Sequence, residues 1–242
     1  MRMGSDFIDM EENVRNSLVR RKRMQMKYPH VKKVGQTSEV GTFIRRTYNI
    51  FLISIVGTSL CGVMAFFTLP PSAFIPLSIA DAVLWIVCGW FGWRRPIEFV
   101  FLLFTVVTGS LLGMIALRYA EAGLSHIFLN AAILTILSFV VLSIYVHMSQ
   151  RNFSGLIGFL TAGFFILLGG LIVLFFIRSN IFHVGLSVLG TLVFSAWVLF
   201  DTSCIIHRSD SDLTPAIAAF ELYLDLMGLF SYVLDLLDMA DN

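Results

Sequence analysis

Long apolar segments recur along the chain and alternate with short polar turns. A helix needs about 20 predominantly apolar residues to cross roughly 30 Å of hydrocarbon. After a polar stretch of 46 residues, the apolar segments fall at approximately 47–69, 74–93, 98–117, 127–147, 155–177, 181–206 and 215–238. The pattern therefore predicts an all-α polytopic membrane protein with seven transmembrane helices.

Helices are favoured over a membrane β-barrel because the segments are continuously apolar. Barrel strands alternate apolar and polar residues instead. A helix also satisfies its own backbone hydrogen bonds, as dry lipid requires. Helix breakers mark the turns between the segments, among them Pro70, Pro71, Pro96, Gly123 and Pro215.

Three regions follow from this pattern. Residues 1–46 form a basic, cytoplasmic N-terminal tail, residues 47–238 form the seven-helix transmembrane domain, and residues 239–242 form a short acidic C-terminal tail. Pro29 is expected to interrupt any helix in the N-terminal tail, and no cleavable signal peptide is evident. The basic tail either contacts anionic lipid headgroups, at about 1 kcal/mol per basic residue, or serves only to set the topology.

Composition and charge placement support the membrane interpretation and orient it. Only 14% of the residues are charged, whereas soluble domains carry about 25%. An N-terminus on the inner side leaves only Arg118 and Arg178, of the 17 lysines and arginines, on the outer side. Basic residues favour the cytoplasmic side, so we expect this orientation. The last segment holds several acidic residues, and whether it crosses the membrane or folds back stays open.

Other residue types indicate packing rather than chemistry. Cys61, Cys88 and Cys204 lie far apart, which matches neither a disulfide framework nor a metal site. Gly109 and Gly113 have the GxxxG spacing that permits close helix packing. No nucleotide-binding loop, serine nucleophile or nucleic-acid signature is found, so we predict no enzyme and no cofactor. Most of the five histidines are expected at the ends of the spans; they are His30, His126, His147, His183 and His207.

Acidic residues inside the apolar segments carry the clearest functional signal. An ionised side chain at the bilayer centre costs roughly 2.5–3.5 kcal/mol on insertion scales, and such residues usually face the interior of a bundle. The candidates are Asp81, Asp201, Glu221, Asp225 and Asp235. The simpler alternative is that these acids reach the interface or pair with Arg118 or Arg178.

Asp201 and Asp225 are predicted to form a pair. They lie on consecutive segments joined by a short turn, roughly 8–10 Å and about 15 Å from the turn at 1.5 Å per residue. Two charges about 4 Å apart repel by about 4 kcal/mol at an effective dielectric of 20. We therefore expect the pair to share one proton near neutral pH and to act as a pH-sensitive gate.

A stripe of residues extends this prediction along the last segment. Glu221, Asp225, Gly228, Tyr232 and Asp235 recur at spacings of three and four, which places them on one face of a helix. We expect this acidic face to point into the protein or towards a water-filled cavity.

Several motifs together resemble the Bax inhibitor-1 family of membrane proteins. The resemblance covers roughly residues 45–237 and is most specific where an Asp-Thr pair is followed by a Leu-Tyr-Leu-Asp motif. The matching stretches include Phe200-Asp201-Thr202-Ser203, Ile205-Ile206-His207, Leu222-Tyr223-Leu224-Asp225, Leu229-Phe230, Gly109-Ser110-Leu111-Leu112-Gly113 and Arg151-Asn152-Phe153-Ser154-Gly155.

The resemblance implies a fold in which six helices surround a central seventh. It implies a pH-sensitive calcium leak whose sensor, by motif match, is the pair Asp201 and Asp225, with a stress- or cell-death-modulating role. Calcium would be the transported ion, held weakly by these two carboxylates. Glu221, Asp81 and Asp235 are auxiliary candidates. The family's basic latch residue in an early helix is missing here, where Asp81 stands instead.

Two other functions remain open alongside the leak. One is a non-conducting regulator that binds a membrane protease or a death regulator. The other is an intramembrane aspartyl protease, although its Gly-x-Gly-Asp motif is absent around Asp225. The expected partners are the lipid bilayer, calcium ions and a membrane protease, with no nucleic acid. The C-terminus lacks the basic tail of the family's eukaryotic members, so the resemblance favours the inner membrane of a bacterium over the endoplasmic reticulum.

Overall fold

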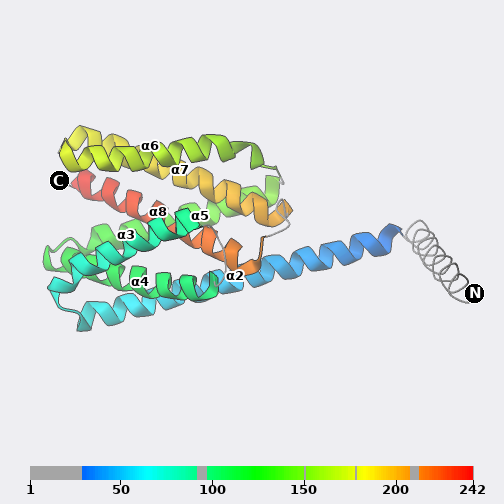
Figure 1. Ribbon diagram of the computed structural model, residues 1–242, viewed down its shortest axis with the longest axis horizontal. Coiled ribbons are helices and arrows are strands. Elements are labelled where there is room, and N and C mark those ends of the chain that lie inside the picture. The colour runs from blue at the N-terminus through cyan, green and yellow to red at the C-terminus, as the bar shows by residue number, and fades with distance from the viewer. Residues whose placement is uncertain (1–28, 92–96, 150, 178, 208–212, 242) are drawn as a thin grey trace, which may run out of the picture. The chain divides into compact units, whose positions relative to one another are not determined.

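The computed structural model is helical throughout the part of the chain that it describes, which comprises residues 29–91, 97–149, 151–177, 179–207 and 213–241. Its α-helices are α2 (Pro29–Thr68), α3 (Phe74–Phe91), α4 (Ile97–Glu121), α5 (Ser125–Ser149), α6 (Ile157–Phe176), α7 (Asn180–His207) and α8 (Pro215–Asp241) (Figure 1). Two short 3-10 helices, η1 (Pro71–Ala73) and η2 (Ser154–Leu156), precede α3 and α6.

The predicted spans correspond closely to these helices. Among the described residues, six stretches are long and apolar enough to cross a membrane: Val40–Thr68, Phe99–Glu121, Ser125–Ser149, Ser154–Leu174, Asn180–His207 and Pro215–Asp241. The remaining predicted span, 74–93, forms α3, whose described apolar part Pro71–Trp85 is shorter. The protein is therefore an integral, multi-pass helical membrane protein, with a seventh crossing by α3 left as a prediction.

The first helix differs from the prediction at its N-terminal end. The first span was predicted at 47–69, whereas the described part of α2 runs from Pro29 to Thr68. Residues 29–46 of the predicted tail are therefore helical, and an interruption at Pro29 stays a prediction. Residues 1–28 of the predicted tail lie outside the described residues, as do Arg94, Arg95, Arg178 and Arg208.

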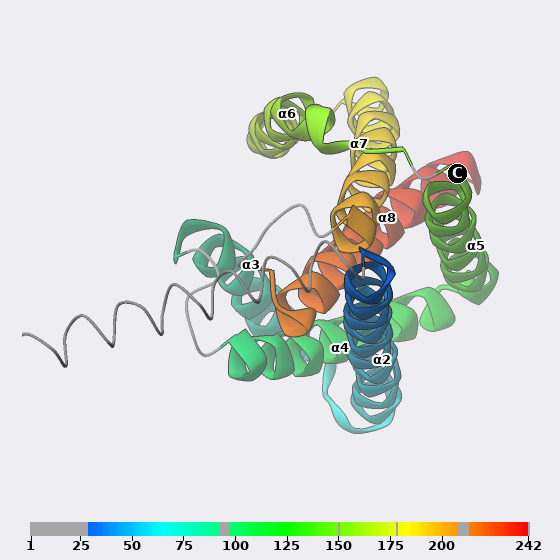
Figure 2. The same cartoon turned by 90° about the vertical axis from the view of Figure 1, so that its right-hand side faces the viewer.

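The chain divides into two compact units, Met1–Phe43 and Ile44–Asn242, and the bundle is the second of them. Within the bundle, α8 packs against α7, α5 and α4, while α6 packs on α7 and α3 packs on α4. Figure 2 shows α8 between α7, α5 and α4, with α6 beside α7.

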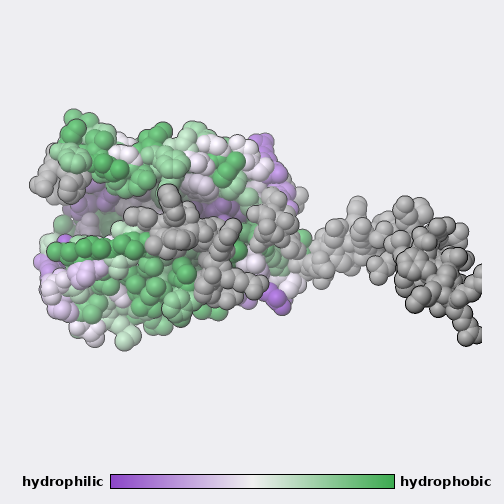
Figure 3. Space-filling view, in the orientation of Figure 1, coloured by the Kyte–Doolittle hydropathy of each residue, from purple (hydrophilic) through white to green (hydrophobic). Residues whose placement is uncertain are grey.

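Helix α8 is the most buried of the spans. In its most apolar stretch 67% of the residues are buried, against 17% in α6. The last helix therefore has the inner position that the sequence predicted for it, whereas a full ring of six helices around it stays a prediction. Apolar side chains cover much of the outer face, and hydrophilic ones gather at its ends and in the gap beside α6 and α7 (Figure 3).

Close glycine contacts set the distance between α2 and α4. A β-carbon on Gly113 would collide with the backbone of Gly62, and one on Gly109 would lie 2.6 Å from the carbonyl oxygen of Thr58. The predicted GxxxG pair therefore allows two helices of the same chain to meet backbone to backbone, as small residues do in membrane bundles.

Candidate functional site

Asp201 and Asp225 lie side by side in the interior of the bundle. Asp201 is on α7 and Asp225 is on α8, and they are only 6% and 5% exposed. Their side chains form a hydrogen bond with each other. An ionised carboxylate can only accept hydrogen bonds, so this contact requires at least one of the two groups to carry a proton.

Small residues at the α7–α8 contact bring these two carboxyl groups together. Gly190 on α7 lies directly under the ring of Tyr232, and Gly228 on α8 lies directly against the ring of Phe194. A side chain at either glycine would collide with the facing ring. The close approach of α7 and α8 therefore depends on two glycines that each face an aromatic ring of the other helix.

Polar groups continue from the pair along the same end of α7. Thr202 and Ser203 are completely buried. The Ser203 hydroxyl accepts a hydrogen bond from the backbone amide of Phe153 at 3.0 Å and donates to the carbonyl of Arg151 at 3.3 Å. Ser203 thereby fixes the α5–α6 loop to this end of α7.

Some polar atoms beside the pair have no hydrogen-bond partner in the described part of the chain. One of them is the second carboxyl oxygen of Asp225, Oδ2. Buried polar groups normally have partners, and one that lacks them often marks a functional site. Glu221, one helical turn before Asp225, is half-buried and interacts electrostatically with it. Three acidic side chains, those of Asp201, Asp225 and Glu221, therefore lie near one another at this site.

Asp81 belongs to a neighbouring cluster and is not hydrogen-bonded to the aspartate pair. It lies on α3 and accepts a hydrogen bond of 2.5 Å from the hydroxyl of Thr108 on α4. Tyr223 interacts electrostatically with Asp81, and its hydroxyl lies 2.8 Å from that of Thr58 on α2. This cluster joins α2, α3, α4 and α8 through polar contacts.

Sequence reasoning missed most of that cluster. Tyr223 was noted only as part of the Leu-Tyr-Leu-Asp motif, and Thr58 and Thr108 were not singled out. Hydroxyl-bearing residues are common in membrane helices, where they often bond to their own backbone, as Thr105 does with the carbonyl of Phe101. Only the packing of four helices distinguishes Thr58 and Thr108 from such residues.

Asp235 lies away from the pair, towards the end of α8. It pairs with His183 on α7 at 3.7 Å, and both side chains are nearly half exposed. The predicted acidic stripe is therefore not uniformly interior, because Asp225 and Gly228 are buried while Asp235 reaches a partly exposed position. The sequence placed His183 at the end of a span, where it is found, but did not predict its acidic partner.

The basic residue Arg118 contacts an aromatic ring. Its guanidinium lies 3.6 Å from the centre of the Phe74 ring. Among the described residues no group of three or more histidine, cysteine or acidic side chains is arranged to hold a metal ion. Weak calcium binding by Asp201 and Asp225 therefore stays a prediction. Among the described side chains, Cys61 and Cys204 are not joined in a disulfide.

Comparisons with known proteins connect this architecture to one family. The sequence model of the family described as "Inhibitor of apoptosis-promoting Bax1" matches residues 40–242. An uncharacterized membrane protein of Vibrio cholerae is 28% identical over 224 residues, which cover 89% of this chain and 97% of that protein.

Two further relatives have more specific names. The protein named Bax inhibitor 1 of Schizosaccharomyces pombe is 31% identical over 212 residues, covering 83% of this chain and 77% of the relative. The modulator of FtsH protease YccA of Escherichia coli is 32% identical over 139 residues, covering 57% of this chain and 63% of the relative. These relatives are named as an inhibitor and a modulator rather than as enzymes.

Proposed function

Because this chain belongs to the Bax inhibitor-1 family, we propose that it is a pH-sensitive cation leak with calcium as the transported ion. The proposed gate is the pair Asp201 and Asp225. The observation that supports it is the buried hydrogen bond between the two carboxyl groups, which joins α7 to α8. The relatives support a bacterial inner membrane as the location.

The state of one shared proton would decide whether α7 and α8 stay together. With one proton present, one carboxyl group donates and the other accepts. Loss of that proton places two negative charges side by side, at a cost of about 4 kcal/mol for a 4 Å separation and an effective dielectric of 20. A second proton removes the charge-assisted character of the bond, which also weakens it.

The chemistry of the pair suits an ion that passes rather than one that stays. Calcium prefers six to eight oxygen ligands in a tight site. Asp201 and Asp225 together supply about four carboxyl oxygens, fewer than such a site needs, so calcium would bind weakly. Conduction requires binding that is favourable enough for entry and weak enough for release.

Calcium flux in proteoliposomes tests this proposal. The full-length chain would be reconstituted around a calcium indicator, and uptake would be measured between pH 5 and pH 8. We expect wild-type flux to vary with pH and the variants Asp201→Asn and Asp225→Asn to lose that variation. The matched control is Asp241→Asn, the same substitution at an exposed position of α8.

The outcomes of this experiment are distinct. A pH dependence that is unchanged in both variants would remove the pair from its role as a gate. Absence of calcium flux from the reconstituted wild-type protein at every pH would exclude the leak itself.

A non-conducting role is supported by a different observation. The similarity to a modulator of FtsH protease favours regulation of a membrane protease, with a modulating role in stress or cell death. Co-purification of the chain with a membrane-bound protease from a bacterial membrane tests this role. Binding that persists in the double variant Asp201→Asn/Asp225→Asn, in a protein that carries no flux, would favour regulation over conduction.

A further inference from the structure

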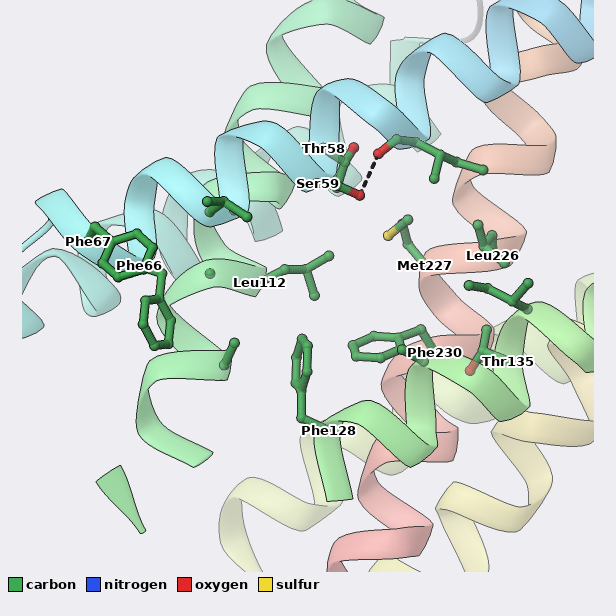
Figure 4. A pocket seen from close by; sticks show the side chains of 17 residues that line it. Thr58, Ser59, Phe66, Phe67, Leu112, Phe128, Thr135, Leu226, Met227 and Phe230 are labelled. Atoms are coloured by element: carbon green, nitrogen blue, oxygen red, sulfur yellow. Dashed lines mark hydrogen bonds between the residues drawn. The ribbon is translucent and has the colours of Figure 1, made fainter. Parts of the chain in front are cut away.

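A cavity of about 440 Å³ lies between α2, α4, α5 and α8, and neither Asp201 nor Asp225 lines it. Its walls are mainly apolar and aromatic side chains, with Leu112, Phe128 and Phe230 around its centre (Figure 4). The volume falls in the range of small-molecule sites, about 300–1,000 Å³. The proposed leak makes no use of this cavity.

The cavity has the form of a wedge because α2 and α5 separate along their length. The two helices touch near the end that holds Phe51 and Phe139, whose rings stack at 5.2 Å. Towards the other end, Phe66 of α2 and Phe128 of α5 both line the cavity instead of packing together. The open end of the wedge is thus the end where α2 finishes and α5 begins.

The mouth of the cavity lies on the lipid-facing surface. Three of its lining residues, Val63, Phe67 and Ile136, are 57%, 78% and 56% exposed. Its inner wall includes Thr135, which is only 1% exposed. The cavity therefore leads from the surface that contacts lipid into the interior of the bundle.

We propose that this cavity binds one acyl chain of a bilayer phospholipid. Thr135 lies ten residues from Ser125, the first residue of α5, so it is about 15 Å along the helix. That depth is close to the middle of a hydrocarbon core of about 30 Å. The cavity therefore extends from near the membrane surface at Ser125 to the middle of the bilayer. The acyl chain of a phospholipid in that leaflet spans the same depths.

Other occupants fit the observations less well. Water is not stable in a cavity with so few polar groups. A helix is about 10–12 Å wide with its side chains and would not reach a residue as buried as Thr135. The hydroxyl of Thr58, which also lines the cavity, is already engaged with Tyr223 at 2.8 Å. An acyl chain is thin, flexible and apolar, and it is present wherever the protein is.

Photo-crosslinking identifies the occupant and its position. The full-length chain would be placed in nanodiscs that contain phosphatidylethanolamine with a diazirine in the middle of one acyl chain, and labelled peptides would be mapped by mass spectrometry. We expect labels on the inner walls, at Leu112 and Thr135. Labels confined to exposed residues such as Phe67 would mean ordinary surface contact with lipid and would overturn the proposal.

Filling the cavity provides the second measurement. Ala132→Phe adds a ring to the α5 wall, and Ala116→Leu adds volume from α4 as a check if the first variant does not fold. The control is Ala162→Phe, which adds the same volume to an exposed position of α6. In native mass spectrometry we expect Ala132→Phe to retain one lipid fewer than the wild type, and Ala162→Phe to retain the same number.

The hydroxyl of Thr135 distinguishes an acyl chain from a polar ligand. Its oxygen has no hydrogen-bond partner among the described residues. Thr135→Val replaces the hydroxyl by a methyl group, so the variant is expected to retain the lipid at least as well as the wild type. Loss of the bound molecule in this variant would show that it accepts or donates a hydrogen bond at Thr135, and an acyl chain would then be excluded.

Discussion

Helices α8 and α6 occupy opposite extremes of this bundle. Helix α8 is the least apolar of the six candidate spans and the most buried, whereas α6 is among the most apolar and the least buried. Helix α6 carries no charged residue, while α8 carries five acidic ones, Glu221, Asp225, Asp235, Asp238 and Asp241. Of these two helices, the more polar one is thus the more buried, which is the reverse of what a soluble protein shows.

The solvent explains this reversal. Lipid tails do not drive an apolar helix into the bundle, because they are as apolar as its side chains. Lipid does exclude ionisable groups, which are expensive in hydrocarbon unless protein surrounds them. The acidic helix is therefore enclosed, and its apolar counterpart remains in contact with lipid.

The largest loss of stability is expected when a side chain is added at a glycine in the α7–α8 contact. Gly228→Leu would drive a leucine into the ring of Phe194, and overpacking of this kind costs about 3 kcal/mol or more. Gly169→Leu on α6 is the control, because no atom lies within 4 Å of its added β-carbon. Thermal unfolding in detergent should show a large loss of thermal stability for Gly228→Leu and none for Gly169→Leu. Equal losses of stability in the two variants would contradict the contrast between α8 and α6.

A smaller effect is expected from the proton of the aspartate pair. Raising the pH until the last shared proton is lost adds a repulsion whose upper value is about 4 kcal/mol, and we expect roughly half of it as the helices relax. Thermal stability of the wild type should therefore fall as the pH rises. In Asp225→Asn an amide replaces the titrating group and donates to Asp201, so the fall should disappear. A fall that persists in this variant would assign the pH dependence to other groups.

A loss of about 1 kcal/mol in the free energy of unfolding is expected when a hydrogen bond in the polar cluster around α8 is removed. Tyr223→Phe removes the hydroxyl that lies 2.8 Å from that of Thr58. The double variant Tyr223→Phe/Thr58→Val should cost less than the two single variants together, since both remove the same bond. Thr161→Val on α6 should change little, because its hydroxyl bonds only to its own helix, at Ile157. Additive losses in the double variant would exclude the bond as the cause.

The smallest effect is expected where α8 reaches a partly exposed position. His183→Gln removes the partner of Asp235, and both side chains are nearly half exposed. Exposed ion pairs contribute about 0–1 kcal/mol and are screened by salt. The loss in thermal stability should therefore be small and reduced in high salt. A large, salt-independent loss would mean that His183 has a structural role in the core.

The spans were predictable because lipid imposes a local rule on the chain. Ser125–Ser149 and Asn180–His207 extend only a few residues beyond the predicted segments 127–147 and 181–206. The helical stretch of α2 before the predicted span, residues 29–46, was not predictable in the same way, because it is polar and lipid imposes no rule on it. Cavities such as the wedge between α2 and α5 leave no periodic signal at all.

The sequence by itself determined that this is a multi-pass helical membrane protein and which stretches are long and apolar enough to cross a membrane. It also made Asp201 and Asp225 the acids most suited to meet. Local hydrophobicity and spacing suffice for those conclusions, since each depends on one segment or on two neighbouring ones. Only the tertiary structure decided that Tyr223 contacts Thr58 and interacts with Asp81, and that Asp235 pairs with His183. It also decided that α2 and α5 separate to leave a cavity. Those outcomes depend on how several helices pack at once, and no single segment encodes that packing.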